Sequence, residues 1–187
     1  MLSVFGFLTI TWLILAAFPF ATSKRQWEYE LLSIDTFTSD ESKLKIDFRV
    51  VRMGRGEFGF SGEIAFNYDA DETTMVEGKG YRSTTGGESD YKVLPFDVPE
   101  QPYTEFLDKH YKNLIINNLA ECSNLPQYEG DFVPPWPKDT YIFDKCIPKA
   151  DGYPDFALEG YYKMVFKVTG PVNWGFTAIA RIITKRI

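Results

Sequence analysis

The stretch RGEFGFSGEIAFNY, residues 55–68, decides the fold of this chain. Its even positions from Phe58 to Tyr68 are large and apolar except at Gly62, while its odd positions are small or polar. Alternation with a period of two is typical of a β-strand that has one buried face. We therefore expect a strand whose aromatic face meets either a solid core or a ligand cavity.

Seven further stretches have the pattern of strands, and glycine or proline lies at nearly every junction between them. They are residues 27–34, 45–52, 73–83, 89–96, 140–146, 160–170 and 173–187. Frequent glycine and proline favour antiparallel strands joined by turns over βαβ units. We expect a mostly β domain with about eight strands in an antiparallel meander.

One helix is predicted to interrupt the strands. Apolar side chains recur at helical spacing from Pro102 to Leu119, and charged side chains take the other side. Pro102 suits the first turn of a helix, where its missing N–H costs nothing. We expect this amphipathic helix to cover one side or one end of the sheets.

A proline-rich loop follows the helix. Its run Pro134-Pro135-Trp136-Pro137 predicts an extended polyproline segment. Two interpretations stay open for this loop. Phe132 and Trp136 are candidates for the rim of a cavity mouth, or else the loop is simply packed against the rest of the chain.

Composition limits the class of protein. The chain has 187 residues, a net charge of -6 and an aromatic content of 17%. The length suits one domain, which we place at residues 24–187. An acidic chain without a basic stripe argues against nucleic acid as a partner. So many aromatic rings indicate a large core, an interface or an apolar pocket.

The first 23 residues carry no charged side chain and end in Ala21-Thr22-Ser23, which suits a signal peptidase. We predict that residues 1–23 are a secretory signal peptide. The alternative is an uncleaved membrane anchor, because the apolar stretch approaches the length of a membrane span. In both cases the remaining chain is extracytoplasmic, and after cleavage we expect a secreted protein without stable membrane insertion.

Cys122 and Cys146 are the two cysteines of the chain. In an oxidising compartment they most simply pair with each other, and closing a loop of this length stabilises a fold by roughly 3 kcal/mol. A zinc site needs about four ligands, whereas His110 is the single histidine. We expect neither a metal nor another cofactor.

No motif predicts an enzyme. Gly54 to Gly59 match a glycine-rich phosphate loop in spacing, but a strand follows them where a dinucleotide site needs a helix, so a hairpin turn is favoured. His110 falls at or beside the apolar positions of the predicted helix, which favours a structural role over that of a catalytic base. Paired carboxylates stay possible, although nothing singles out one pair. A lipid hydrolase that depends on His110 is the least favoured hypothesis.

Several stretches together resemble one known family. They are RVVRMGRGEFGFSGEI, ESDYKVLPF, CSNLPQYEGDFVPPWPKDTYIFDKC and GYYKMVFKVTG followed by NWGFTA. They are similar to the insect CheB (chemosensory protein B) family, which resembles the ganglioside-activator branch of the ML lipid-recognition superfamily. The resemblance implies a secreted, immunoglobulin-like antiparallel β-sandwich opened into an apolar cup, with lipids or long cuticular hydrocarbons as ligands. Ganglioside activators have several disulfides, whereas this chain can form one.

The leading hypothesis is a secreted, non-enzymatic binder or presenter of a lipid or hydrocarbon pheromone in gustatory chemosensation. Its candidate ligand-lining residues are Phe58, Phe60, Ile64, Phe66, Tyr68, Tyr162, Met164, Phe166, Trp174 and Phe176. The alternative is an extracellular interaction protein with a solid core that modulates a sensory receptor or ion channel through its loops, without a bound ligand.

Overall fold

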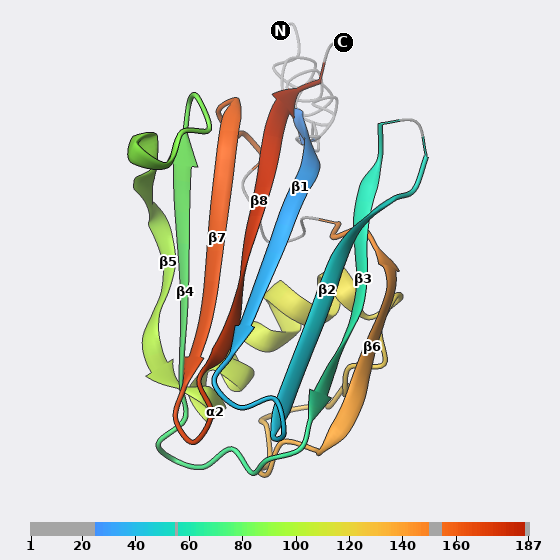
Figure 1. The fold of residues 1–187 in the computed structure, drawn as a ribbon, viewed down its shortest axis with the longest axis vertical. Helices are drawn as coiled ribbons and strands as arrows, with labels where there is room; N and C mark the ends of the chain where they lie inside the picture. The colour runs from blue at the N-terminus through green and yellow to red at the C-terminus, as the bar shows by residue number, and fades with distance from the viewer. Residues whose placement is uncertain (1–24, 55, 150–154, 186–187) are drawn as a thin grey trace, which may run out of the picture.

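The structure is a computed structural model that describes residues 25–54, 56–149 and 155–185, apart from the side chain of Phe96. The predicted signal peptide, residues 1–23, lies outside the described residues. Eight strands of the described chain form two antiparallel sheets that face each other, and one helix lies beside them (Figure 1). The predicted β-sandwich with a single helix is confirmed.

The larger sheet has five strands and the smaller has three. The order in the larger is β1 (Trp27–Thr38), β8 (Trp174–Thr184), β7 (Gly160–Thr169), β4 (Met75–Ser83) and β5 (Lys92–Pro102). The order in the smaller is β2 (Leu44–Arg52), β3 (Phe58–Phe66) and β6 (Asp139–Cys146). The predicted meander is therefore wrong, because β1 pairs with β8 and β4 with β7. The two sheets cover each other's apolar face, and the chain passes from one sheet to the other several times.

The register of β2 and β3 explains the alternation of apolar and polar residues from Phe58 to Tyr68. Phe66 of β3 lies opposite Leu44, and Ile64 lies opposite Ile46. Directly paired residues of antiparallel strands point to the same face. Because Leu44 and Ile46 are buried, the even positions of β3 face the interior, as the sequence predicts.

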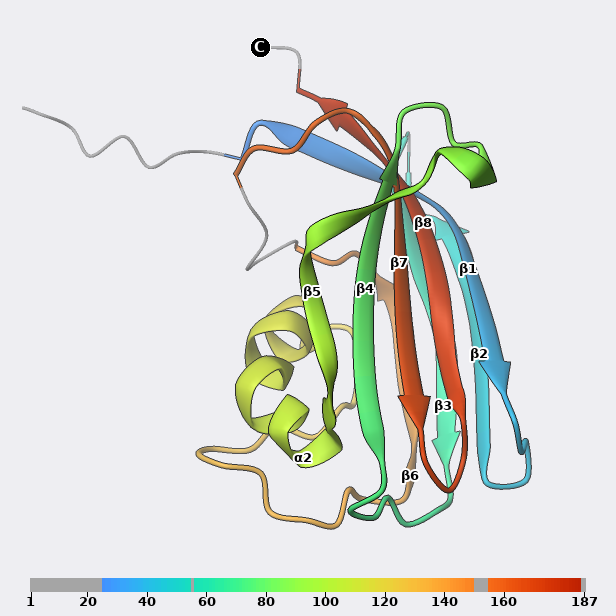
Figure 2. The same cartoon turned by 90° about the vertical axis from the view of Figure 1, so that its left-hand side faces the viewer.

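The helix begins directly after β5 and is continuous from α2 (Tyr103–Phe106) through η2 (Leu107–Ile116) to α3 (Asn117–Leu119). Its central part is wound as a π-helix, in which the Asn117 N–H donates to the Lys112 carbonyl five residues earlier. Its buried residues pack against Val76 of β4 and Val168 of β7. Figure 2 shows the helix beside the lower half of the larger sheet. The helix and the smaller sheet thus cover different parts of the same sheet face.

The turn between β4 and β5 differs from the prediction, because residues 88–90 form a short helical turn, η1 (Glu88–Asp90), where a strand was expected. The Asp90 carboxylate accepts hydrogen bonds from Ser83 Oγ and Thr84 N, both at 2.9 Å, and from Thr85 N at 3.1 Å. These hydrogen bonds lower the pKa of Asp90. A side chain that satisfies the backbone of its own turn competes with strand pairing, so β5 begins later than predicted.

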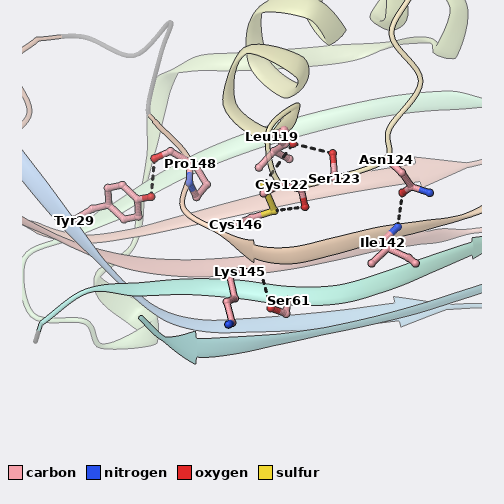
Figure 3. Close-up of a disulfide and its surroundings, with 10 residues drawn as sticks. All are labelled: Tyr29, Ser61, Leu119, Cys122, Ser123, Asn124, Ile142, Lys145, Cys146 and Pro148. Carbon is pink, nitrogen blue, oxygen red and sulfur yellow. Dashed lines mark hydrogen bonds between the residues drawn. A yellow bond between two sulfur atoms is a disulfide. The ribbon is translucent and has the colours of Figure 1, made fainter. Parts of the chain in front are cut away.

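The predicted pairing of Cys122 with Cys146 is confirmed, with 5.3 Å between their Cα atoms (Figure 3). The bridge joins the chain after the helix to the end of β6. Asn124 extends this join, because its side-chain oxygen accepts from Ile142 N at 2.6 Å and its amide nitrogen donates to the Thr140 carbonyl at 3.0 Å. The disulfide therefore holds the helix end and the following loop against the smaller sheet.

Candidate ligand-binding face

Five of the predicted ligand-lining residues, which we call the first set, lie on β3 or, in the case of Tyr68, two positions after its end. Phe60, Phe66 and Tyr68 are buried, and Phe58 and Ile64 are partly buried beside them. The Phe66 and Tyr68 rings lie 4.5 Å apart. All five side chains face the interior between the sheets, so their predicted orientation agrees with the structure.

Phe48 of β2 fills the gap that Gly62 leaves in this aromatic face. Phe48 lies opposite Gly62, and a Cβ at Gly62 would overlap the Asp47 carbonyl and come within 2.7 Å of the Phe48 ring. The Phe48 ring is 5.4 Å from Phe60 and 5.1 Å from Phe143 of β6. Glycine is needed here because the neighbouring strand and its ring approach too closely for any side chain.

The second set comes from β7 and β8. Phe166 lies opposite Phe176, with ring centroids 5.4 Å apart, and contacts Trp174 at 5.9 Å and Phe106 of the helix at 5.7 Å. Trp174 Nε1 donates to the Tyr68 hydroxyl at 3.0 Å, which links the larger sheet to the chain after β3. These rings thus join both sheets and the helix in one packed interior.

The two sets lie in different sheets and therefore do not form one wall on adjacent strands. β3 belongs to the smaller sheet, and β7 and β8 belong to the larger. Phe48 connects the sets, because its ring also lies 6.3 Å from Phe176. The rings face one another across the sandwich and are in contact, so this part of the interior is packed with side chains.

Tyr162 and Met164 extend the second set toward the upper end of β7. They alternate with residues on the outer face such as Lys163, whose Nζ lies 4.2 Å from the centroid of the Tyr91 ring. Their partners on β8 are the small residues Ala180 and Ala178. We call Tyr162, Met164, Ala178 and Ala180 the open inner face. Met164 is 44% exposed although it points to the same side as the packed Phe166.

The open inner face lies above the helix. Figure 2 shows the helix along the lower half of the sheet, while β4 and β7 continue upward beyond it. Apolar side chains of the segment before β7 are also exposed, with Leu158 at 54% and Phe156 at 67%. The Tyr162 hydroxyl donates to the Leu158 carbonyl at 2.7 Å, which places this segment against the open inner face. This arrangement offers apolar surface for a ligand without separating the packed rings.

The predicted rim residues Phe132 and Trp136 do not stand exposed at a mouth. Both are partly buried, with ring centroids 5.9 Å apart, and Trp136 lies 5.4 Å from Tyr111 of the helix. The chain also bends at Pro134 and Pro135, so the predicted extended polyproline segment is wrong. The cause is packing, because two large rings gain more by covering the helix than by facing solvent.

One surface depression lies elsewhere, between β1 and β2. It has a volume of about 290 Å³ and is lined by Thr36, Phe37, Thr38, Glu41 and Ile46. Most of these side chains are polar, and none belongs to the predicted ligand-lining set. The depression therefore does not suit a long apolar molecule.

A comparison with protein families gives one match. Residues 77–164 match the family described as Protein of unknown function (DUF1091). The matched segment covers slightly less than half of the chain, from β4 through the helix and both cysteines to Met164 of β7. A comparison with curated proteins finds no match.

The DUF1091 match thus includes most of β4, the helix and the two β7 residues of the open inner face, whereas β1, β2, β3 and β8 lie outside it. Over residues 25–54, 56–149 and 155–185, none of the helices has the length and apolar composition needed to cross a membrane.

A cluster of tyrosines beside the helix predicts sensitivity to alkaline pH. Tyr111 and Tyr128 are stacked at 5.6 Å, and their hydroxyls donate to the carbonyls of Pro126 and Leu107. Burial raises the pKa of Tyr128 and of Tyr141 to about 12, and raises that of Tyr111 as well.

Below pH 10, the ordinary pKa of tyrosine, these phenols are neutral in the folded and in the unfolded protein, and their full contribution to stability is present. As the pH rises from 10 toward 12, they ionise in the unfolded chain first, which favours unfolding, and the contribution is lost. We expect the thermal midpoint, followed by circular dichroism, to fall steeply between these values. Tyrosinate absorbance of the folded protein should show phenols that ionise well above pH 10, Tyr111, Tyr128 and Tyr141 among them. Ionisation of every tyrosine near pH 10 in the folded protein would contradict this expectation.

Sequence reasoning missed two residues that shape this region. Phe48 connects the ring sets, and Arg82 of β4 lies opposite Tyr162 at the upper end of the open inner face. A signal for Arg82 exists in the alternation of β4, where Val76, Gly78, Gly80 and Arg82 share one face. In this pattern two glycines precede the cation Arg82 on one face of the strand. The pairing of β4 with β7 is what places this cation beside the apolar surface.

Proposed function

We propose that this protein is a secreted, non-enzymatic binder or presenter of a long-chain apolar molecule, a lipid or a hydrocarbon. Its proposed setting is gustatory chemosensation, because the sequence resembles the insect CheB family. The observation that carries the proposal is the open inner face, where the apolar side of β7 continues from the packed Phe166 to the exposed Met164.

The energy of such binding is sufficient. Burying an alkyl chain yields about 0.8 kcal/mol per CH₂, so a chain of about twenty carbons yields on the order of 16 kcal/mol. Association and ordering cost ~4–15 kcal/mol. A ligand that buries most of its alkyl chain against Met164, Tyr162 and Leu158 therefore needs no charged contact for measurable affinity.

The test uses methyl palmitate, a neutral long-chain probe, and the variant Met164→Asp. A carboxylate in the contact surface would have to be desolvated, so we expect binding to weaken at least ~10-fold. The matched control is Val93→Asp. Val93 is 64% exposed and lies opposite Tyr81, which pairs with Lys163 on the outer face of the same sheet.

Binding is measured by native mass spectrometry and by displacement of a fluorescent fatty probe, with circular dichroism to show that each variant is folded. Equal weakening by both substitutions would mean that the open inner face is not the site. No binding of either this probe or its free acid, palmitate, to the wild-type protein would remove the proposal.

A specific observation favours a second candidate function, an extracellular interaction protein that modulates a sensory receptor or channel through its loops. Most of the predicted ligand-lining rings are packed against one another, as in a solid core. Val133 in the loop before β6 is 82% exposed, which suits a contact with another protein. Saturable binding to sensory-neuron membranes that is lost on Val133→Asp and kept on Met164→Asp would favour this candidate.

A further inference from the structure

Arg82 stands where the open inner face ends. It lies on β4 opposite Tyr162 of β7, and paired residues of antiparallel strands share a face. Burial raises the pKa of Tyr162, while the charge of Arg82 and a hydrogen bond between the two side chains lower it. From Phe166 to Tyr162 the strand rises by about 13 Å, so an extended chain lying along β7 would reach from the packed rings to Arg82.

The guanidinium of Arg82 is incompletely satisfied. Its Nη2 donates to the Glu159 carbonyl at 2.6 Å, but its Nε is buried and has no hydrogen-bond partner among the described residues. Among the residues that the structure describes, no carboxylate forms an ion pair with Arg82, whereas six lysines each pair with a carboxylate elsewhere. A buried donor without a partner is rare in folded proteins and needs an explanation.

The surroundings add to this cationic character. Lys92 of β5 lies opposite Arg82, so it projects to the same side of the sheet. The Glu159 carboxylate lies nearby, but it accepts a hydrogen bond from Thr184 N of β8 at 2.9 Å. In a chain with a net charge of -6, two cations thus meet at one end of an apolar surface.

We propose that the ligand is a long-chain carboxylic acid, whose alkyl chain lies on the open inner face and whose carboxylate binds Arg82. The inference rests on the proposed function and narrows its ligand class. A guanidinium presents its N–H groups as a fork that matches the two oxygens of a carboxylate. The carboxylate would accept from N–H groups of the partly exposed Arg82 side chain, and Lys92 would add attraction at longer range.

A purely structural role makes a different prediction. If Arg82 served just to hold the segment before β7 through the Glu159 carbonyl, its removal would lower stability and would weaken every ligand alike. Head-group recognition instead weakens charged ligands and leaves neutral ligands of the same chain length unchanged. Comparing two ligands on one protein therefore separates the two roles.

The experiment compares palmitate with methyl palmitate, which has the same chain and no charge. The wild-type protein is expected to bind palmitate about 10- to 100-fold more tightly, as a charge-assisted hydrogen-bonded pair predicts. Arg82→Gln should remove this preference while methyl palmitate binds as before. Arg82→Lys, which keeps the charge without the fork, should keep part of it.

Arg181→Gln is the matched control, because Arg181 is exposed and lies over the Tyr161 ring on the outer face of the sheet. It should leave the affinities for both ligands unchanged. If Arg82→Gln fails to fold, Arg82→Lys tests the role of Arg82, and the comparison of the two ligands on the wild-type protein still tests the preference for the acid.

The outcomes separate this inference from the proposed function. Equal affinity of the wild-type protein for the acid and the ester would overturn the carboxylate inference and leave the apolar binding function in place. Binding of neither ligand would overturn both. A preference for palmitate that survives in folded Arg82→Gln would show that another group binds the head.

Discussion

Phe60→Ala is expected to lower the free energy of unfolding by about 3–5 kcal/mol, the range found when a buried phenylalanine is truncated. Phe60 is 8% exposed, and its ring contacts Phe48 at 5.4 Å and Phe143 at 5.8 Å. These neighbours belong to the strands on either side of β3, and their own rings lie 5.1 Å apart. Because backbone hydrogen bonds fix the three strands relative to one another, the cavity left by the ring can collapse only in part.

Urea unfolding followed by tryptophan fluorescence measures this loss. The control is Ile142→Ala, because Ile142 of β6 is 54% exposed and its truncation should cost less than about 1 kcal/mol. Equal losses in the two variants would contradict the packed interior. A small loss at Phe60 combined with tighter ligand binding would restore the view that these rings line a cavity.

The double substitution Cys122→Ser and Cys146→Ser is expected to cost about 3 kcal/mol, because the disulfide closes a loop in the unfolded chain. The bridge spans a sequence separation of 24 residues. Cys146 is completely buried, so the substitution also places a hydroxyl in the interior. For a domain with a typical stability of about 5–15 kcal/mol, this is a large fraction.

Unfolding of the wild-type protein is measured with and without a reducing agent, and compared with the double variant. The reductant should destabilise the wild-type protein and leave the double variant unchanged. Because Cys122 follows the helix, hydrogen exchange should accelerate first in α3 and in the loop before β6. If the reductant lowers neither the midpoint nor the protection of α3, the bridge does not hold the helix end in solution.

Local patterns were sufficient to predict the eight strands and the helix, although not the short helical turn η1. The alternation around Phe60 depends on the period of a strand, and the spacing from Tyr103 to Leu119 depends on the period of a helix, so both can be recognised within one segment. The disulfide was also predictable, because the chain has just two cysteines. The order of strands was not, since neither the pairing of β1 with β8 nor that of β4 with β7 leaves a local signal.

The candidate site was predicted in part for the same reason. The inward direction of Phe60 and Phe166 follows from alternation. Whether each inward residue is packed or exposed depends on what lies opposite, and the helix covers Phe166 while Met164 lies beyond its end. The misplaced rim residues have a similar cause, because nothing local shows that Trp136 lies against Tyr111.

The sequence by itself thus determined the class of the fold, the apolar face of β3, the amphipathic helix and the disulfide, because each depends on side-chain type and spacing along the chain. The tertiary structure alone decided that Phe48 fills the space beside Gly62 and that Met164 stays exposed. It also placed Arg82 beside Tyr162, without an ion-pair partner among the described residues. The physical reason is that burial and pairing are properties of neighbours in space. In a sheet whose adjacent strands come from distant parts of the chain, those neighbours exist only once the chain has folded.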